Sequence, residues 1–305
     1  MKAINLGNSG LLASEISVGC MRIDGLGQHE ADTLINTSLE VGINFFDHAD
    51  VYGGGKSEEV FADAFSRSSF TREQIYLQSK CGIRQGMFDF SRENILAAVE
   101  GSLSRLKTDY LDVLLLHRPD TLMEPEEIAD AFSRLQQSGK VHHFGVSNMN
   151  PGQIELLRKF VDQKIVANQL QLSLTNTGMI DSGINVNMEI DRSINRDGGI
   201  LEYCRLHNIT IQPWSPFQYG FFEGVFLDND KFPELNRAID TLAEEKRVAN
   251  TAIAIAWLLR HPAKMQPIVG TTNPGRVRDI AQASSVEMTR KEWYDLYLAA
   301  GNTLP

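Results

Sequence analysis

Short apolar runs alternate with longer amphipathic runs along most of the chain. The short runs are rich in leucine and β-branched residues, which predicts strands, and one of them, Val113-Leu114-Leu115-Leu116, is apolar on both faces. Strands buried on both faces are typical of a parallel sheet covered by helices. Eight strands are predicted, at residues 16–21, 43–46, 75–80, 111–117, 142–146, 166–172, 209–214 and 266–269.

The runs between these strands have the spacing of amphipathic helices. Ser91 stands at the N-cap position of one of them, and Pro125 stands in the first turn of another, where a missing N–H has no cost. Gly139 is placed to end that second helix. Further helices are predicted at residues 30–41, 56–65, 154–161, 251–260 and 276–283.

Eight alternating strand–helix units close naturally into a (β/α)8 TIM barrel, so residues 1–305 are predicted to form one barrel domain. Two short segments around Gly7-Asn8-Ser9-Gly10 precede the first unit and predict an N-terminal β-hairpin. The alternative is an open doubly wound sheet. Against it, no Gly-x-Gly-x-x-Gly follows the first strand, and no linker divides the chain.

The connection after the sixth strand, residues 176–199, is much longer than the few residues usual between a strand and its helix. It is polar and contains glycine, and inside it Ile184, Val186, Met188 and Ile190 alternate with polar residues. One interpretation is a surface excursion. The other is a lid or specificity loop, because connections of this kind open on the catalytic face of a barrel.

Composition and charge narrow the possible functions. The chain is 42% hydrophobic and 22% charged, which is ordinary for a globular protein, and its formal net charge is −10. No segment concentrates lysine and arginine, so a nucleic-acid partner is not expected. Cys20, Cys81 and Cys204 have no Cys-x-x-Cys spacing, which argues against a zinc site or a disulfide framework. Without an apolar N-terminal leader or spanning segment, we expect a cytoplasmic protein with no membrane anchor, and a monomer.

Ionisable side chains stand at or directly after the ends of three successive predicted strands. Asp47 ends the hydrophobic run of Gly42-Ile43-Asn44-Phe45-Phe46, and Tyr52 follows five residues later; Lys80 and His117 end the next two strands. Each has a simpler interpretation: Asp47 as a helix cap, Lys80 as an exposed cation, Tyr52 and His117 as packed residues. Because the carboxyl ends of barrel strands face one mouth, their joint placement favours a shared catalytic site.

These residues and their contexts resemble the aldo-keto reductase family, in particular its bacterial, general oxidoreductase-like branch. The family's Asp, Tyr, Lys and His tetrad falls on Asp47, Tyr52, Lys80 and His117. Other matching segments are Gly145-Val146-Ser147-Asn148, Gln169, Trp214-Ser215-Pro216, Thr271-Thr272-Asn273 and Arg276. The resemblance extends from the N-terminal hairpin to the region of Arg276.

The resemblance implies an NAD(P)H-dependent oxidoreductase that reduces aldehydes or ketones to alcohols. Tyr52 would donate the proton, and the charge of Lys80 would favour its phenolate character. Asp47 would hold the lysine ammonium in place. His117 would orient the substrate oxygen and donate a hydrogen bond as negative charge develops there.

The resemblance also implies a site for NADP(H), with NAD(H) as the alternative. Trp214 would stack on the nicotinamide ring, unless it is a buried core aromatic, and Ser147, Asn148 and Gln169 would bind the carboxamide. The segment from Ser215 to Gly220 would follow the pyrophosphate. The full set of expected cofactor residues is Met21, Arg22, Asp47, Ser147, Asn148, Gln169, Trp214, Ser215, Pro216, Phe217, Gly220, Gly270, Thr271, Thr272, Asn273 and Arg276.

Three features depart from the family pattern. Gly270 stands where many members have a lysine that helps to hold the 2′-phosphate of NADPH, which weakens the case for NADPH over NADH. Arg118 stands where many have tryptophan, and we expect a salt-bridged surface residue there, with a substrate anchor as the alternative. Three phenylalanines after the seventh strand could belong to a lid or to the pocket wall: Phe221, Phe222 and Phe226.

Two other functions compete with carbonyl reduction. The first is a cofactor-binding redox sensor or regulatory subunit with little turnover, as related potassium-channel β-subunits are thought to be. The second is a barrel hydrolase that uses Asp47 and another carboxylate, but it leaves Trp214 and residues 273–276 without a role. The intact tetrad favours the enzyme and a small aldehyde or ketone as its substrate.

Overall fold

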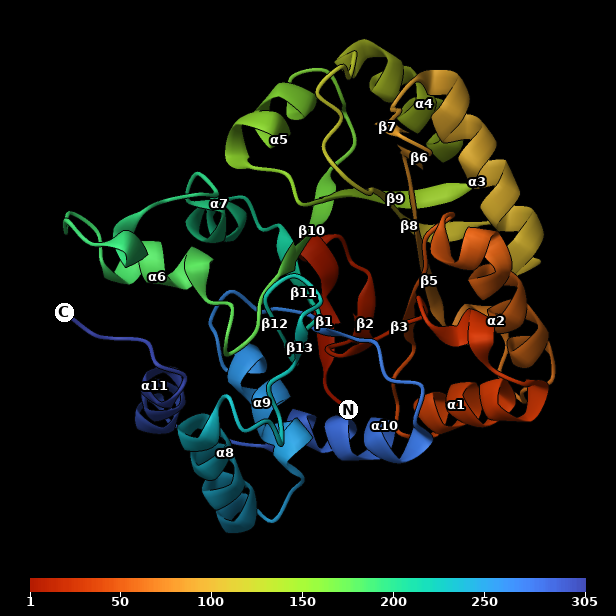
Figure 1. The fold of residues 1–305 in the computed structure, drawn as a ribbon. Coiled ribbons are helices and arrows are strands. Elements are labelled where there is room, and N and C mark those ends of the chain that lie inside the picture. Colours follow the sequence, from red (N-terminus) through yellow and green to blue (C-terminus); the bar gives the residue numbers. More distant parts are fainter.

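The computed structural model describes residues 1–305 and is built around a closed barrel of eight parallel strands (Figure 1). The (β/α)8 prediction is therefore confirmed, and the open-sheet alternative is wrong. All eight predicted strands are present, with ends shifted by a few residues. In barrel order they are β3 (Ser17–Gly19), β4 (Phe45–Asp47), β5 (Tyr76–Cys81), β8 (Leu111–Leu116), β9 (Val141–Ser147), β10 (Ile165–Gln171), β11 (Thr210–Trp214) and β14 (Ile268–Val269).

Helices surround the barrel, and their apolar faces pack against its outer surface. Those that follow the eight strands are α1 (Gln28–Glu40), α2 (Lys56–Ser66), α3 (Arg92–Leu106), α4 (Pro125–Gln137), α5 (Pro151–Arg158), α7 (Ile200–Leu206), α9 (Asn250–Leu259) and α10 (Pro274–Ala281). Three further helices were not predicted: α6 (Gly178–Ile184), α8 (Pro233–Lys246) and α11 (Arg290–Ala299). None of the helices is long and apolar enough to cross a membrane.

The helix ends follow local rules. The Ser91 hydroxyl accepts a hydrogen bond from the Asn94 amide at the start of α3, as predicted for an N-cap. Pro125 occupies the first turn of α4, and Gly139, with a φ of 73°, lies just beyond its end. The Asn273 side chain accepts from the amides of Gly275 and Arg276 and so fixes the start of α10, beside the last barrel strand.

The N-terminal hairpin closes one end of the barrel. Its strands, β1 (Ala3–Asn5) and β2 (Leu12–Ser14), are antiparallel, as predicted. Leu6, Leu11 and Ala13 pack with buried side chains of β4, β8 and β10 in a separate small core. Gly7 lies so close to Val166 that a Cβ would stand 2.5 Å from its Cα, and its φ of 56° also favours glycine. The amino-terminal end of the barrel is thereby sealed.

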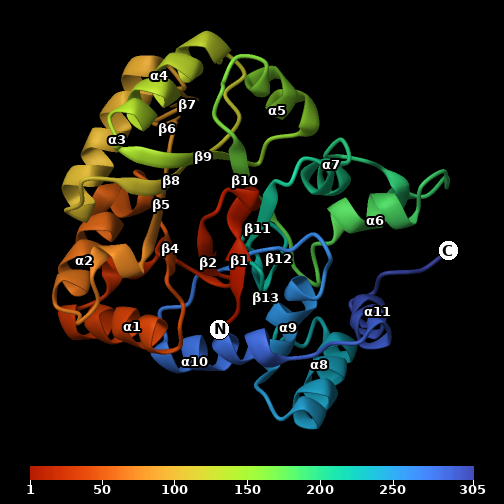
Figure 2. The same cartoon turned by 180° about the vertical axis from the view of Figure 1, so that it is seen from behind.

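The long connection after β10 lies at the side of the molecule, next to the C-terminal segment (Figures 1 and 2). It contains α6, and the Tyr297 hydroxyl donates to Asp181 over 2.6 Å. Arg192 donates to the Gly301 carbonyl over 2.9 Å. These contacts hold residues 176–199 against α11 and the chain end, and none of these residues borders the large cavity described below. In this structure the segment is a surface excursion.

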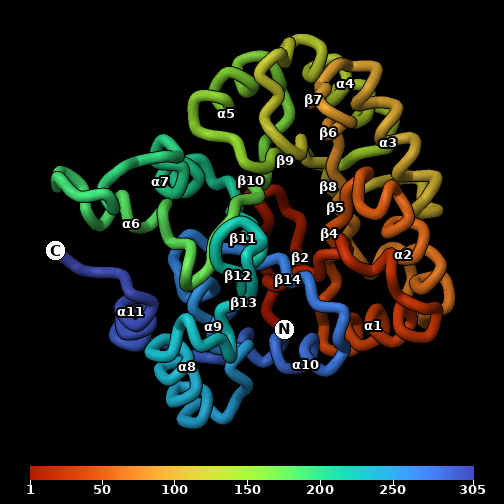
Figure 3. The backbone as a smooth tube through the Cα atoms, viewed as in Figure 1, coloured from red at the N-terminus to blue at the C-terminus, as the bar shows by residue number.

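Two short antiparallel hairpins lie outside the barrel sheet. One is formed by β6 (Ile83–Arg84) and β7 (Met87–Phe88), which follow β5. The other is formed by β12 (Gln218–Tyr219) and β13 (Gly224–Val225), which follow β11 near the centre of Figure 3. Gln218, Phe222 and Val225 of this second hairpin border the cavity. The β12–β13 hairpin is therefore the irregular element that shapes the carboxyl-terminal mouth of the barrel.

Candidate active site

Asp47, Lys80 and Tyr52 form one hydrogen-bonded chain at the carboxyl-terminal end of the barrel. Asp47 is the last residue of β4, Lys80 lies on the adjacent strand β5, and Tyr52 stands in a short 3-10 helix after β4. The Lys80 ammonium donates to Asp47 Oδ2 over 2.7 Å, to the Tyr52 hydroxyl over 3.1 Å and to the His48 carbonyl over 2.8 Å. All three donor positions of the ammonium are used, so its location is fixed.

The ion pair between Lys80 and Asp47 is almost completely buried, with side-chain exposures of 0% and 2%. Burial acts to lower the pKa of Lys80, but the charges of Asp47 and Tyr52 and their hydrogen bonds raise it above its ordinary value. The lysine is consequently a cation at neutral pH. It donates directly to the tyrosine hydroxyl.

The pKa of Tyr52 is raised because burial disfavours the phenolate. The nearby Lys80 charge acts in the opposite direction, as the resemblance implied, but does not outweigh the burial. Tyr52 is therefore protonated at neutral pH. A protonated phenol held against a cation is poised to give up its proton when negative charge develops nearby.

A chain of buried glutamines supports the other carboxylate oxygen of Asp47. Gln78 donates to Oδ1 over 2.6 Å, and Gln169 donates to the same atom over 3.0 Å. Gln212 accepts from Gln78 over 2.9 Å and donates to Gln266 over 2.9 Å. This network spans the barrel interior and was missed in the sequence. The available signal was glutamine within otherwise apolar strands, because a buried amide requires polar partners.

His117 follows the last residue of β8, and its ring stands edge-on to Tyr52 with 5.8 Å between the ring centroids. Its Nδ1 is buried without a hydrogen-bond partner. Burial lowers the pKa of His117 well below its ordinary value, and the charges of Lys80 and Arg118 act in the same direction. The imidazole is therefore neutral, with one N–H to donate and one nitrogen to accept.

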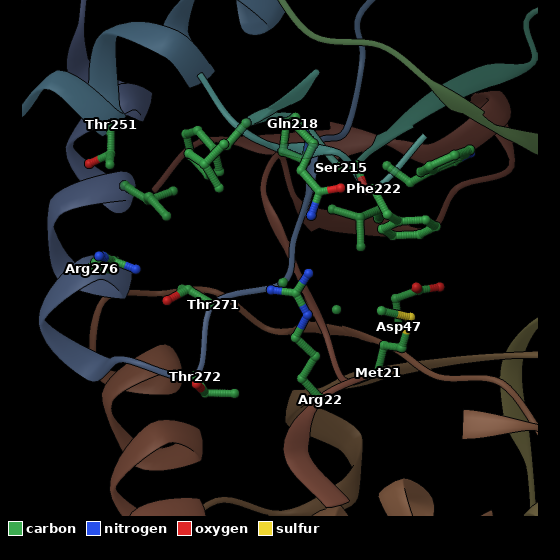
Figure 4. A pocket seen from close by; sticks show the side chains of 18 of the residues that line it. Met21, Arg22, Asp47, Ser215, Gln218, Phe222, Thr251, Thr271, Thr272 and Arg276 are labelled. Carbon is green, nitrogen blue, oxygen red and sulfur yellow. The ribbon is translucent and has the colours of Figure 1, made fainter. Parts of the chain in front are cut away.

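A cavity of about 630 Å³ opens above these residues (Figure 4). Asp47 lies at one end, and Thr271, Thr272 and Arg276 lie at the other end beside α10. Tyr52, which is linked to Asp47 through Lys80, and His117, which stands edge-on to Tyr52, also border the cavity. Arg22 extends between the two sides of the cavity (Figure 4). The other expected cofactor residues that border it are Met21, Ser147, Asn148, Gln169, Trp214, Ser215, Pro216, Phe217, Gly270 and Asn273.

Two residues predicted for the site do not border this cavity. Lys80 lies beneath it and reaches it through Tyr52. Gly220, expected beside a pyrophosphate, occupies a turn between β12 and β13 with a φ of 58°, and its carbonyl accepts from Gln171 over 2.7 Å. Left-handed backbone favours glycine, so the turn accounts for the residue type at this position.

Ser147, Asn148 and Trp214 form a rigid wall of the cavity. The Trp214 indole N–H donates to Asn148 Oδ1 over 3.1 Å, and Asn148 Nδ2 donates to Ser147 Oγ over 2.7 Å. Asn148 and Ser215 both have left-handed backbone, with φ of 57° and 52°. Such conformations are uncommon in these residue types and concentrate at functional sites. Trp214 is only partly buried, so it is not a core aromatic.

Arg118 was expected to be a salt-bridged surface residue, and this is wrong. It is half-buried, borders the cavity, and forms neither a hydrogen bond nor an ion pair. Its guanidinium carbon lies 5.7 Å from the centre of the Trp214 ring. Of the three phenylalanines, Phe222 stacks on Trp214 and borders the cavity, Phe221 is exposed, and Phe226 is part of the core.

Several cavity residues could not be identified from the sequence. Asn250 and Thr251 begin α9, and Asp279 lies on α10. They lie far from the strand ends in the sequence and belong to no recognisable motif. The remaining ones are Gly19, Gln218, Val225, Leu227, Asp228, Ile268 and Ile280.

We expect Asp50, between Asp47 and Tyr52, to give the protein a specific pH dependence. Its side chain is only 5% exposed, lies 3.5 Å from Arg84, and has no hydrogen bond to either oxygen. Burial raises its pKa from 3.8 to about 6, although Arg84 acts to lower it. The folded state then binds more protons than the unfolded state between these pH values, so this residue's contribution to stability falls as pH rises through that window.

Asp50→Asn removes this titration. We expect the free energy of unfolding of the variant, relative to the wild type, to increase by up to about 3 kcal/mol as the pH is raised from 4 to 7.5. Urea unfolding at both pH values measures the difference. Asp63→Asn, at an exposed carboxylate paired with Lys107, is the control and should show no such increase. The prediction would be contradicted if the free energies of unfolding of Asp50→Asn and the wild type differed by the same amount at both pH values.

The chain is similar to known oxidoreductases along most of its length. The family model described as the aldo/keto reductase family matches residues 15–297. YcsN of Bacillus subtilis, an uncharacterized oxidoreductase, is 35% identical over 300 residues, which cover 94% of each chain. A 6-dehydroglucose reductase of Agrobacterium fabrum is 35% identical over 277 residues, covering 87% of this chain and 86% of its own.

Solved structures share the fold. The thermostable aldo-keto reductase Tm1743, in complex with the inhibitor epalrestat, matches with a TM-score of 0.78 and 24% identity, covering 98% of this chain and 100% of its own. The Bombyx mori aldo-keto reductase in complex with NADP matches with a TM-score of 0.74 and 20% identity, covering 97% of this chain and 92% of its own.

Proposed function

The chain belongs to the aldo/keto reductase family of oxidoreductases that act on carbonyl compounds, and from this premise we propose that it reduces aldehydes and ketones with NADPH, using Tyr52 as proton donor. The observation that carries the proposal is the buried chain from Asp47 through Lys80 to the Tyr52 hydroxyl, which ends at the cavity. It provides an acid whose conjugate base is stabilised by a fixed cation.

The residues around the cavity fit a nicotinamide dinucleotide. Arg22 and Arg276 border it without forming ion pairs, which leaves cationic groups for phosphates. The start of α10 lies at the same end, where backbone N–H groups favour an anion. Trp214 presents an aromatic surface in a fixed orientation beside Asn148. NADPH, when bound, would supply the hydride.

The protein side chains then perform the remaining steps. A substrate carbonyl oxygen held between Tyr52 and His117 would accept a hydrogen bond from each of them. As that oxygen gains negative charge, the Tyr52 hydroxyl transfers its proton to it, and the resulting phenolate is stabilised by Lys80 at 3.1 Å. Asp47 keeps the ammonium in place, and the glutamine network keeps Asp47 in place.

Oxidation of NADPH in the presence of reactive carbonyls tests this function. We expect turnover with nitrobenzaldehydes or methylglyoxal, followed as loss of NADPH absorbance. If the protein binds NADPH tightly but reduces none of these compounds, the enzymatic proposal is overturned. A cofactor-binding sensor would then be favoured. Comparison of the KM values for NADPH and NADH tests the choice of cofactor, and a clear preference for NADH would contradict it.

Gly270→Lys should strengthen the preference for NADPH. Gly270 borders the cavity next to Thr271, is exposed, and a Cβ built there meets no atom within 4 Å. An added ammonium near Arg276 would interact with a 2′-phosphate, which NADH lacks. We expect the ratio of Kd values, NADH over NADPH, to rise by about 3- to 10-fold, as for an exposed ion pair of about 1 kcal/mol. Gly270→Gln is the neutral control, and an equal change in both variants would contradict the role of charge.

A further inference from the structure

Arg118 is a cation without a partner at the catalytic end of the cavity. It follows His117 directly and lies half-buried over the ring of Trp214. It forms no hydrogen bond and no ion pair. Burial lowers the pKa of its guanidinium, and only the neighbouring Tyr52 acts in the opposite direction. A partly desolvated charge that no group in the protein neutralises is unfavourable unless a ligand of opposite charge binds to it.

The carboxylates of Asp120, Asp47 and Asp50 are engaged elsewhere. Asp120, two residues along the chain, accepts from the backbone amides of Phe90 and Leu122 over 3.0 and 2.9 Å. Asp47 pairs with Lys80, and Asp50 pairs with Arg84. None of these three carboxylates is therefore free to form an ion pair with Arg118, even if its side chain rotates. The guanidinium is held in the cavity by its packing over Trp214 rather than by an ion pair.

The position of Arg118 separates it from the groups proposed for the cofactor phosphates. Arg276 lies at the α10 end of the cavity, and Arg22 extends between its two sides (Figure 4). Arg118 instead lies beside His117 and Trp214, where the reacting carbonyl is proposed to bind. The ion pair of Lys80 and Asp47 is neutral as a unit, and His117 is neutral. Arg118 is consequently a cation beside His117 that is neither balanced by an acidic side chain nor assigned to the cofactor phosphates.

We propose that Arg118 binds a carboxylate of the substrate, so that the natural substrates are aldehydes or ketones that carry a carboxylate group. This inference rests on the function proposed above. One guanidinium matches one carboxylate in charge and in its planar, two-pronged hydrogen-bonding geometry. A phosphate, with a charge of about −1.5 to −2 at neutral pH, would leave excess negative charge in a half-buried site.

The test compares 4-carboxybenzaldehyde with its neutral counterpart, methyl 4-formylbenzoate, as substrates of the NADPH-bound enzyme. For the wild type, we expect a higher kcat/KM with the acid. In Arg118→Gln, the ratio of kcat/KM for acid over ester should fall by about 10- to 100-fold, mainly through KM for the acid. Arg118→Lys should lie between the two, because it keeps the charge but loses the paired hydrogen bonds.

Two results would overturn the inference. One is an unchanged ratio of acid to ester in Arg118→Gln while the ester is still reduced, which leaves the proposed function intact. The other is a weaker NADPH affinity in Arg118→Gln, which would assign the guanidinium to the cofactor.

Calorimetric titration of 4-(hydroxymethyl)benzoate into the NADP-bound protein provides a readout that needs no turnover. A Kd for this ligand that rises by about 10-fold or more in Arg118→Gln supports the carboxylate site. This holds even if neither aldehyde is reduced, because the absence of turnover contradicts only the proposed function. Equal affinity in the wild type and Arg118→Gln, or no binding to either, overturns the inference.

Discussion

Tyr52→Phe is expected to reduce kcat for carbonyl reduction on the order of 10²–10⁴-fold, the usual contribution of a positioned general acid. The substitution removes only the hydroxyl that lies 3.1 Å from the Lys80 ammonium and leaves the ring that packs edge-on against His117. The proton source is lost while the shape of the cavity is retained. Steady-state loss of NADPH absorbance with a nitrobenzaldehyde measures the effect.

The controls for this variant separate chemistry from folding. The Kd for NADPH should stay close to that of the wild type, because the hydroxyl is proposed to contact the substrate and not the cofactor. Loss of one hydrogen bond should cost about 1 kcal/mol of stability. Tyr110→Phe removes a hydroxyl outside the cavity that forms no hydrogen bond, so it should retain activity. Near wild-type turnover in Tyr52→Phe would refute its assignment as proton donor.

Lys80→Met is expected to lower both activity and stability. It removes the only cation paired with the buried carboxylate of Asp47, and breaking a buried ion pair by removing one partner costs about 3–5 kcal/mol. It also removes the charge that stabilises a Tyr52 phenolate, so kcat should fall together with stability. Urea unfolding at pH 7 and NADPH oxidation measure the two losses separately.

The double variant Asp47→Asn with Lys80→Met distinguishes the two roles of the pair. Neutralising the carboxylate removes the uncompensated charge, so the double variant should recover most of the lost stability. It should recover no activity, because no cation then faces Tyr52. A double variant with a lower free energy of unfolding than Lys80→Met would contradict this prediction. It would mean that the hydrogen bonds from the glutamine network to Asp47, and not the ion pair, determine the stability of the site.

Periodicity was sufficient to predict the barrel. Each strand of a (β/α)8 barrel is buried on both faces and each helix on one, and both patterns are visible locally. Strand ends were shifted by a few residues: β4 begins at Phe45 and not at Ile43, because pairing with β5, and not hydrophobicity, determines where it starts. Helices α8 and α11 were missed because they lie outside the repeating strand–helix pattern.

The residues that end the strands could also be identified from the sequence, because an ionisable side chain after an apolar run is conspicuous. The sequence by itself determined the barrel and the candidate roles of Asp47, Tyr52, Lys80 and His117. Only the tertiary structure decided what neutralises each charge. Lys80 and Asp47 are far apart in the chain yet 2.7 Å apart in space, and Arg118 faces Trp214 instead of an acidic partner. Ion pairing depends on distance in space, which sequence separation does not fix.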